Sequence, residues 1–167
     1  NYRGAFFVQA SELVASRGWA PLTINQPRYN LLERWVEHDL LEHTDRYGTG
    51  VIAFSPLAQG RLSAKYIDPK NPIPEDSRAK GPEGFLRPDA ITETIVDRVR
   101  RLAPIAQARG QSIAQLALAW VLRDPRVTSA LIGVRNAEQL LDCVRTIDNL
   151  EFTDAELAQI EALFPRD

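Results

Sequence analysis

Short apolar segments alternate with amphipathic segments of helical spacing along this chain, and that alternation limits its folds more than any other feature. Three segments have the length and residue types of buried strands, at residues 21–26, 51–54 and 127–132. Apolar residues at helical spacing lie before the first segment and between the segments. Parallel strands connected by helices are buried on both faces, so the alternation predicts an α/β fold, either a doubly wound sheet or an arc of a (β/α)8 barrel.

Apolar stripes predict three helices in the first two thirds of the chain. The first runs from about residue 6 to Gly18, where a helix end needs a residue with positive φ. The second runs from about residue 31 to Tyr47, and the third covers residues 91–102. Prolines exclude regular helix from most of residues 55–87, so we expect a long loop there, and such loops in compact domains are usually functional.

Capping residues predict three more helices toward the end of the chain. Ser112 and Gln115 have the spacing of a capping box, as do Thr153 and Glu156, and Asn136 is placed to cap a helix between them. The helix that Asn136 starts carries an apolar stripe of Leu140, Leu141, Val144 and Ile147.

The composition is that of a single globular domain. The 167 residues are 44% hydrophobic and 25% charged, which is enough apolar material for a core. The net charge of -2 provides no overall positive field, so we expect neither nucleic acid nor an anionic membrane as a partner. No apolar run is long enough to span a bilayer, and the one cysteine, Cys143, cannot form an internal disulfide, so we expect a cytoplasmic protein.

The start of the sequence and its small number of strands suggest that more of the fold lies elsewhere. The sequence begins at Asn1, contains no methionine and shows no secretory presequence. A three-stranded parallel arc has two open edges and few places to bury its apolar faces. We therefore expect a chain cut from a longer protein, and a natural half-barrel that pairs with another chain is the open alternative.

Several common site signatures are missing from the sequence. No glycine-rich dinucleotide motif follows a strand, and residues 48–50 (Gly-Thr-Gly) precede their strand and predict only a turn. His38 and His43 are five residues apart, which does not place two imidazoles on one helical face, so we interpret them as solvated side chains and predict no metal site. Cys143 has no neighbouring histidine, which favours a small semi-buried side chain over a nucleophile.

Polar and aromatic residues lie at the carboxyl ends of the predicted strands, where parallel α/β folds bind ligands. Asn1 and Gln26 carry side-chain amides, and Phe54 offers a flat face for stacking. The turn from Ser55 to Gly60 offers hydroxyl and N–H groups to phosphate oxygens. An ordinary polar turn is the alternative for each stretch taken alone.

A small anion site is predicted after the third strand. Arg135 precedes a helix that Asn136 caps, so a guanidinium and a helix N-terminus lie together. Lys65 and Arg78, on the long loop, could close over the same anion. The alternative is that Asn136 only caps its helix and that the three basic side chains are solvated.

Two ordered segments resemble a known family. The sequence FSPLAQGRLSAKY at residues 54–66, followed by LIGVRNAEQL at residues 131–140, resembles the carboxyl-terminal half of an aldo-keto reductase. It is most similar to the branch that holds bacterial glyceraldehyde 3-phosphate reductases and potassium-channel β subunits. Residues 25–30 and 112–122 match in the same order, so the resemblance covers nearly the whole chain. It implies that residues 1–167 form part of a (β/α)8 barrel, roughly strands 6 to 8, and bind NADPH.

The resemblance also implies a role for individual residues. Asn1 and Gln26 would hold the nicotinamide carboxamide, and Phe54 would stack on its ring. The other predicted cofactor contacts run from pyrophosphate to adenine: Ser55, Leu57, Gln59 and Gly60 around the pyrophosphate, Lys65 and Arg78 on the closing loop, Gly133 and Arg135 at the 2′-phosphate, Gln139 near its ribose, and Asp142 and Cys143 at the adenine. Cys143 departs from the family pattern, which commonly has Asn at this position, and a thiol is a poorer hydrogen-bonding group.

The resemblance implies an oxidoreductase that reduces small aldehydes or ketones by hydride transfer from NADPH. The family's catalytic Asp, Tyr, Lys and His lie on strands that precede Asn1, so we assign no catalytic residue and expect no turnover by this chain alone. A non-catalytic NADP-binding regulatory subunit, resembling the channel β subunits, is the alternative. A homo-oligomeric full-length form is left open.

Overall fold

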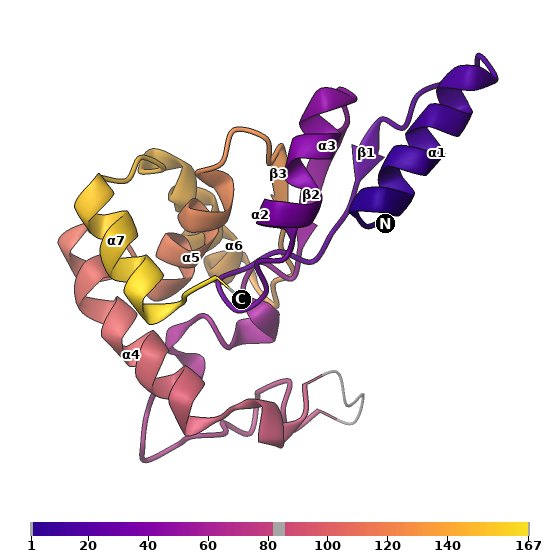
Figure 1. Ribbon diagram of the computed structural model, residues 1–167. Helices are drawn as coiled ribbons and strands as arrows, with labels where there is room; N and C mark the ends of the chain where they lie inside the picture. The colour runs from indigo at the N-terminus through magenta and orange to yellow at the C-terminus, as the bar shows by residue number, and fades with distance from the viewer. Residues whose placement is uncertain (1, 82–85, 167) are drawn as a thin grey trace.

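The computed structural model describes residues 2–81 and 86–166 and has a three-stranded parallel sheet at its centre (Figure 1). The strands are β1 (Ile24–Asn25), β2 (Gly50–Phe54) and β3 (Ser129–Leu131), and β2 lies between the other two. Both pairings are parallel, because helical connections return the chain to the same end of the sheet before each new strand. The predicted α/β fold with parallel strands is confirmed.

The two outer strands are shorter and more exposed than predicted. Strand pairing covers Ile24–Asn25 rather than residues 21–26, and Ser129–Leu131 rather than 127–132. Pro27 follows β1 and has no N–H to donate to a ladder. Ile24 is 56% exposed and Leu131 is 51% exposed, so the prediction that these strands are buried is wrong. Each outer strand has a neighbour on one side only, whereas the central strand β2 buries its inward residues completely.

Helix α1 (Gly4–Ser16) lies at the β1 edge and projects from the rest of the molecule (Figure 1). Its first turn touches α2 (Val36–Asp39), where the Gly4 N–H donates to Asp39 Oδ2 at 3.1 Å. A Cβ on Gly4 would lie 2.2 Å from the Asp39 carbonyl oxygen, so this close approach needs glycine. Gly18 follows the helix with φ of +62°, which confirms the predicted helix end.

The single helix predicted from residue 31 to Tyr47 is wrong at its start and is interrupted in the middle. The structure has α2 and then α3 (Leu41–Arg46), with a break at Leu40. Asn30 explains the late start, because its Oδ1 accepts from the Leu32 N–H at 2.9 Å and its Nδ2 donates to a backbone carbonyl after β2 at 3.0 Å. An Asn side chain that satisfies nearby backbone groups in this way competes with helix formation.

The predicted caps of the later helices are confirmed. Ser112 and Thr153 both form complete capping boxes, and the Asn136 side chain accepts from the Gln139 N–H. The predicted helix at 91–102 starts two residues later and extends further. The helices are α4 (Glu93–Ala108), α5 (Ile113–Leu122), α6 (Ala137–Val144) and α7 (Asp154–Leu163), and short 3-10 turns lie at η1 (Ala58–Gly60), η2 (Ala64–Tyr66), η3 (Pro88–Ala90) and η4 (Arg145–Asp148).

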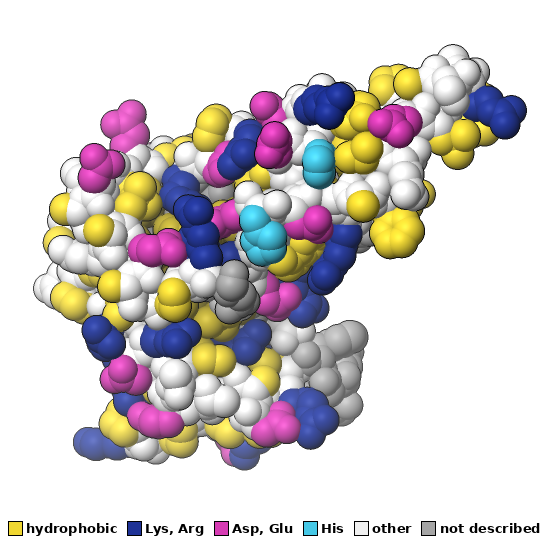
Figure 2. Space-filling model, viewed as in Figure 1, with side chains coloured by type: hydrophobic (Ala, Val, Ile, Leu, Met, Phe, Trp, Pro, Cys, Tyr) yellow, Lys and Arg dark blue, Asp and Glu magenta, His cyan; other side chains and the backbone are white. Residues whose placement is uncertain are grey.

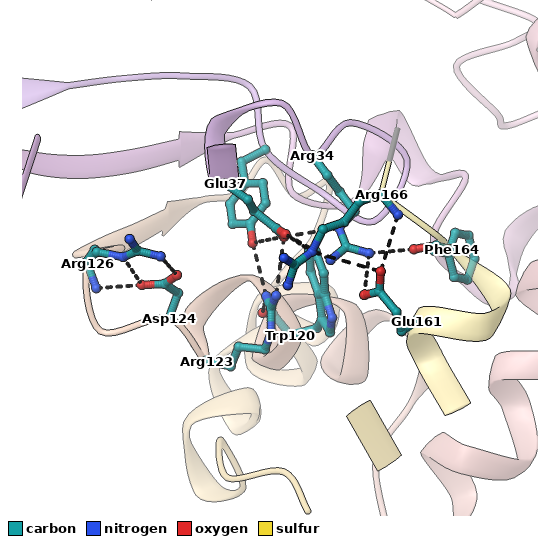
Figure 3. Close-up of polar contacts among 10 residues, drawn as sticks. Arg34, Glu37, Trp120, Arg123, Asp124, Arg126, Glu161, Phe164 and Arg166 are labelled. Atoms are coloured by element: carbon teal, nitrogen blue, oxygen red, sulfur yellow. Dashed lines mark hydrogen bonds and ion pairs between the residues drawn. The ribbon is translucent and has the colours of Figure 1, made fainter. Parts of the chain in front are cut away.

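A buried ion cluster, made of Tyr29, Arg34, Glu37 and Arg123, ties the start of α2 to the end of α5 (Figure 3). Glu37 lies 2.9 Å from Arg34 and 3.3 Å from Arg123, and it accepts a hydrogen bond of 2.7 Å from the Tyr29 hydroxyl. Burial opposes the charged carboxylate, but the hydrogen bonds from Arg34 and Tyr29 prevail and lower the pKa of Glu37. Arg34 also donates to the Phe164 carbonyl, so the cluster fixes the end of the chain as well.

Apolar side chains remain exposed at both edges of the sheet. On α1, Phe6 is 68% exposed, and hydrophobic side chains cover part of the projecting arm in Figure 2. On α6 and just beyond it, the predicted stripe is present but faces solvent, with Leu141 58% and Ile147 64% exposed. Within the described ranges, no helix combines the length and the apolar composition of a membrane span.

Candidate functional site

A cavity of about 940 Å³ lies at the carboxyl ends of β2 and β3. Phe54 and Leu131, the last residues of these two strands, both line it. The loops that follow the strands and the first residues of α5 and α6 form the remaining walls. This is the end of a parallel sheet at which ligands bind, and the volume is in the range of about 300–1,000 Å³ typical of cofactor sites.

The turn that follows β2 has an unusual backbone. Ser55, Ala58 and Gln59 adopt positive φ values of 53°, 48° and 62°, which are uncommon for residues other than glycine. One contact within the turn and one from another segment hold it, since the Ala58 N–H and Asn30 Nδ2 both donate to the Ser55 carbonyl, at 2.9 and 3.0 Å. Successive residues of right-handed and left-handed conformation direct backbone N–H groups toward one concave side, which suits an anion.

Three cations line the same cavity: Lys65, Arg78 and Arg135. Lys65 Nζ and Arg135 Nη1 lie 3.0 and 3.2 Å from the same carboxylate oxygen of Asp76, in the long loop. The hydrogen bond from Lys65 lowers the pKa of Asp76. Asp76 is 70% exposed, so both ion pairs are open to water and exchange partners at little cost.

The start of α6 adds a helix N-terminus to this wall. Asn136 Oδ1 accepts from the Gln139 N–H at 2.9 Å, and Gln139 Oε1 accepts from the Arg135 N–H at 3.0 Å. Gly133 lies next to Arg78, whose Nη2 would be 3.5 Å from a Cβ built at Gly133. The positive end of a helix dipole therefore lies beside two guanidinium groups, an arrangement that favours a phosphate.

Cys143 is half-buried in the wall near the end of α6. Burial and the neighbouring Asp142 carboxylate raise the pKa of its thiol. A raised pKa reduces the thiolate fraction, which agrees with the prediction of a small semi-buried side chain rather than a nucleophile.

The structure brings nearly all of the predicted cofactor residues to one cavity. The exceptions are Gln26, a half-buried residue that is not among the side chains around the cavity, and Asn1, which lies outside the described residues. The Phe54 ring also contacts Arg28, whose guanidinium carbon is 5.4 Å from the ring centroid. The predicted residues that line the cavity are Phe54, Ser55, Leu57, Gln59, Gly60, Lys65, Arg78, Gly133, Arg135, Gln139, Asp142 and Cys143.

Sequence reasoning did not predict several residues of the wall. Ser112 and Asn136 were identified only as helix caps, yet both line the cavity because α5 and α6 start there. Tyr66 lines it as well and is 2% exposed. The caps contained a usable signal, because helix N-termini at the carboxyl edge of a parallel sheet are common ligand-binding positions.

Comparison with known proteins supplies the family. Residues 7–164 match the model of the aldo/keto reductase family. The chain is 50% identical over 145 residues to L-glyceraldehyde 3-phosphate reductase of Escherichia coli O157:H7, which covers 84% of this chain and 41% of that protein. It is 36% identical over 143 residues to a probable voltage-gated potassium channel subunit beta of Oryza sativa subsp. japonica, covering 84% of this chain and 43% of that protein.

The chain thus spans less than half the length of these curated relatives, while the family match extends over most of its own residues. The matched range contains all three strands, the loop after β2 and the start of α6. The fold and the matched range agree, and this chain belongs to the aldo/keto reductase family.

Proposed function

We propose that the cavity at the ends of β2 and β3 binds NADPH, and that this chain is the carboxyl-terminal, cofactor-binding part of the reductase barrel, roughly strands 6 to 8. The observation that carries the proposal is the convergence of three cations, a left-handed turn and two helix N-termini on one cavity beside Phe54. A dinucleotide with a 2′-phosphate is a long ligand with several negative charges and two ring systems. The cavity offers cations, backbone N–H groups and an aromatic ring along its length.

Each segment suits one part of this cofactor. Phe54 would stack on the nicotinamide, and the turn from Ser55 to Gly60 would bind the pyrophosphate through its N–H groups. Arg135 at the start of α6 would bind the 2′-phosphate, the group that distinguishes NADPH from NADH. The cofactor supplies the hydride, and the residues of this chain bind and orient it.

We further propose that the whole protein reduces small aldehydes or ketones to alcohols. Relatives that are named L-glyceraldehyde 3-phosphate reductases, at 50% and 49% identity, support this proposal. No catalytic residue is assigned within this chain. Tyr29 belongs to the buried ion cluster, and burial raises the pKa of its hydroxyl. A hydroxyl with a raised pKa is a poor proton donor, so Tyr29 is not assigned as a catalytic acid.

A regulatory subunit that binds NADP without turnover is the second candidate function. It is favoured by 36% identity to proteins named potassium channel β subunits from Oryza sativa and Schizosaccharomyces pombe. The full-length protein distinguishes the two, since a reductase oxidises bound NADPH when an aldehyde is added and a purely regulatory subunit does not.

The test of cofactor binding is a fluorescence titration of the full-length protein with NADPH and with NADH. Arg135→Ala is expected to weaken NADPH binding by about 1–3 kcal/mol, because a charge-assisted contact to the 2′-phosphate is lost. NADH binding should be nearly unchanged. Arg101→Ala is the matched control, because Arg101 is 63% exposed on α4 and does not line the cavity. Equal losses for both dinucleotides would remove the 2′-phosphate role from Arg135.

A further inference from the structure

The first residues of α5 hold one carboxylate of the cavity in a fixed orientation. Asp142 lies on α6, and its Oδ1 accepts a hydrogen bond of 2.8 Å from Gln115 Nε2. Its Oδ2 accepts a hydrogen bond of 3.1 Å from the Ser112 hydroxyl. Gln115 Nε2 also donates to the Asp142 backbone carbonyl at 2.9 Å. Each carboxylate oxygen of Asp142 therefore accepts a hydrogen bond from one side chain of the α5 capping box.

Neither donor is free to turn away. Gln115 is 7% exposed, and its Oε1 accepts from the Ser112 N–H at 2.9 Å, so both ends of its amide are engaged. The Ser112 oxygen accepts from the Gln115 N–H at 3.1 Å, which directs the single hydroxyl hydrogen toward Asp142. The capping box of α5 thus does more than start a helix, because its two side chains also hold a carboxylate that lies 27 residues after Gln115 in the chain.

We infer that Ser112 and Gln115 are positioning residues that orient Asp142 to recognise the amino edge of the cofactor's purine base. An ionised carboxylate only accepts hydrogen bonds, and each of its oxygens has lone-pair capacity beyond the donor from α5. Asp142 and Ser112 both line the cavity. A base with an exocyclic amino group can donate to such a carboxylate, whereas a base with a carbonyl at the same position meets it acceptor to acceptor.

The neighbouring side chain makes this orientation more important. Cys143 is next to Asp142 in the wall, and its thiol is a weak donor and a weak acceptor. Discrimination among bases at this end of the cavity therefore falls on a carboxylate whose direction is set from α5. This inference rests on the proposed binding of NADPH.

The experiment measures the dissociation constants of NADPH and of reduced nicotinamide hypoxanthine dinucleotide phosphate, in which a carbonyl oxygen replaces the adenine amino group. The full-length protein is expected to bind NADPH about tenfold or more tightly than the analogue, as for one hydrogen bond to a charged group. Gln115→Leu and Ser112→Ala should both bring this ratio toward one. Ser112→Thr keeps the hydroxyl and should retain the ratio.

The controls separate positioning from loss of a helix cap. Thr153→Ala removes the equivalent capping box of α7, which lies away from the cavity, and should leave the base ratio unchanged. The ratio of NADH to NADPH affinity should also stay constant in the α5 variants. The ratio of the two dissociation constants is measured only on folded molecules that bind, so partial unfolding of Gln115→Leu does not imitate the predicted effect. Ser112→Ala tests the same claim with an exposed side chain, whose removal disturbs the core less.

Three results would overturn the inference, and they separate it from the proposed function. A base ratio that persists in Gln115→Leu and Ser112→Ala but disappears in Asp142→Ala would leave Asp142 in the site and remove the positioning role. A full-length protein that binds NADPH in preference to NADH but ignores the base would also remove it. Absence of saturable NADPH binding would overturn the proposed function itself.

Discussion

The carboxylates of Glu37 and Asp76 each hold more than one cation, and they differ mainly in burial. Glu37 in the buried ion cluster is 7% exposed and lies against Arg34 and Arg123 (Figure 3). Asp76 at the cavity is 70% exposed and lies against Lys65 and Arg135. A buried pair cannot lose a member without leaving an unpaired charge in a dry environment, whereas an exposed pair exchanges its partner for water or for a ligand. The same chemical arrangement therefore serves as framework at Glu37, whereas at Asp76 it leaves two cations of the cavity wall free to exchange partners.

The largest expected effect comes from breaking the buried cluster. Glu37→Gln should lower the free energy of unfolding by about 3–5 kcal/mol, because Arg34 and Arg123 lose their shared buried counter-charge and Arg34 keeps only the half-exposed Glu161, at 2.8 Å. Glu93→Gln is the matched control on the surface, where the Arg100 pair is 83% exposed on the Glu93 side and should contribute at most about 1 kcal/mol. Urea unfolding followed by circular dichroism measures both. Equal losses would mean that burial does not separate the two kinds of pair.

The same cluster should make stability depend on acid. The folded-state pKa of Glu37 is lowered, so its stabilisation is fully present above the unfolded pKa and is lost as the pH falls below the ordinary value of 4.5 and through the folded pKa. The difference in unfolding free energy between the native protein and Glu37→Gln should therefore shrink in acid. A series of urea titrations from neutral pH downward checks this, and a constant difference would contradict it.

The smallest expected effect comes from the exposed carboxylate. Asp76→Asn should leave the free energy of unfolding unchanged within experimental error, because water replaces the lost contacts of Lys65 and Arg135. The urea unfolding experiment used for Glu37→Gln provides the measurement. A loss as large as that of Glu37→Gln would show that Asp76 belongs to the framework rather than to an exchangeable surface.

Features that depend on neighbouring residues could be predicted from the sequence. Ser112, Asn136 and Thr153 each accept from the backbone N–H three residues on, as their cap positions predicted. The alternation of strands and helices also gave the parallel sheet, and the strand ends gave the position of the cavity. The caps could be predicted because capping is decided over a few residues, and the parallel sheet could be predicted because helical segments separate the strands along the chain.

Contacts between distant segments could not be predicted in the same way. Arg135 and Asp76 are 59 residues apart, and Gln115 and Asp142 are 27 apart, so nothing in their local sequence pairs them. The predicted helix start near residue 31 failed for a similar reason, because Asn30 contacts the segment after β2 as well as its own neighbours. Tertiary contacts of this kind override local propensity.

The most direct measurement of cofactor binding is a crystal structure of the full-length protein grown with NADPH. We expect the nicotinamide against Phe54, the pyrophosphate in the turn from Ser55 to Gly60 and the 2′-phosphate against Arg135 at the start of α6. In that structure Asp142 should keep its hydrogen bonds to Ser112 and Gln115. A dinucleotide bound elsewhere, or bound in this cavity with its 2′-phosphate away from Arg135, would contradict the assignment.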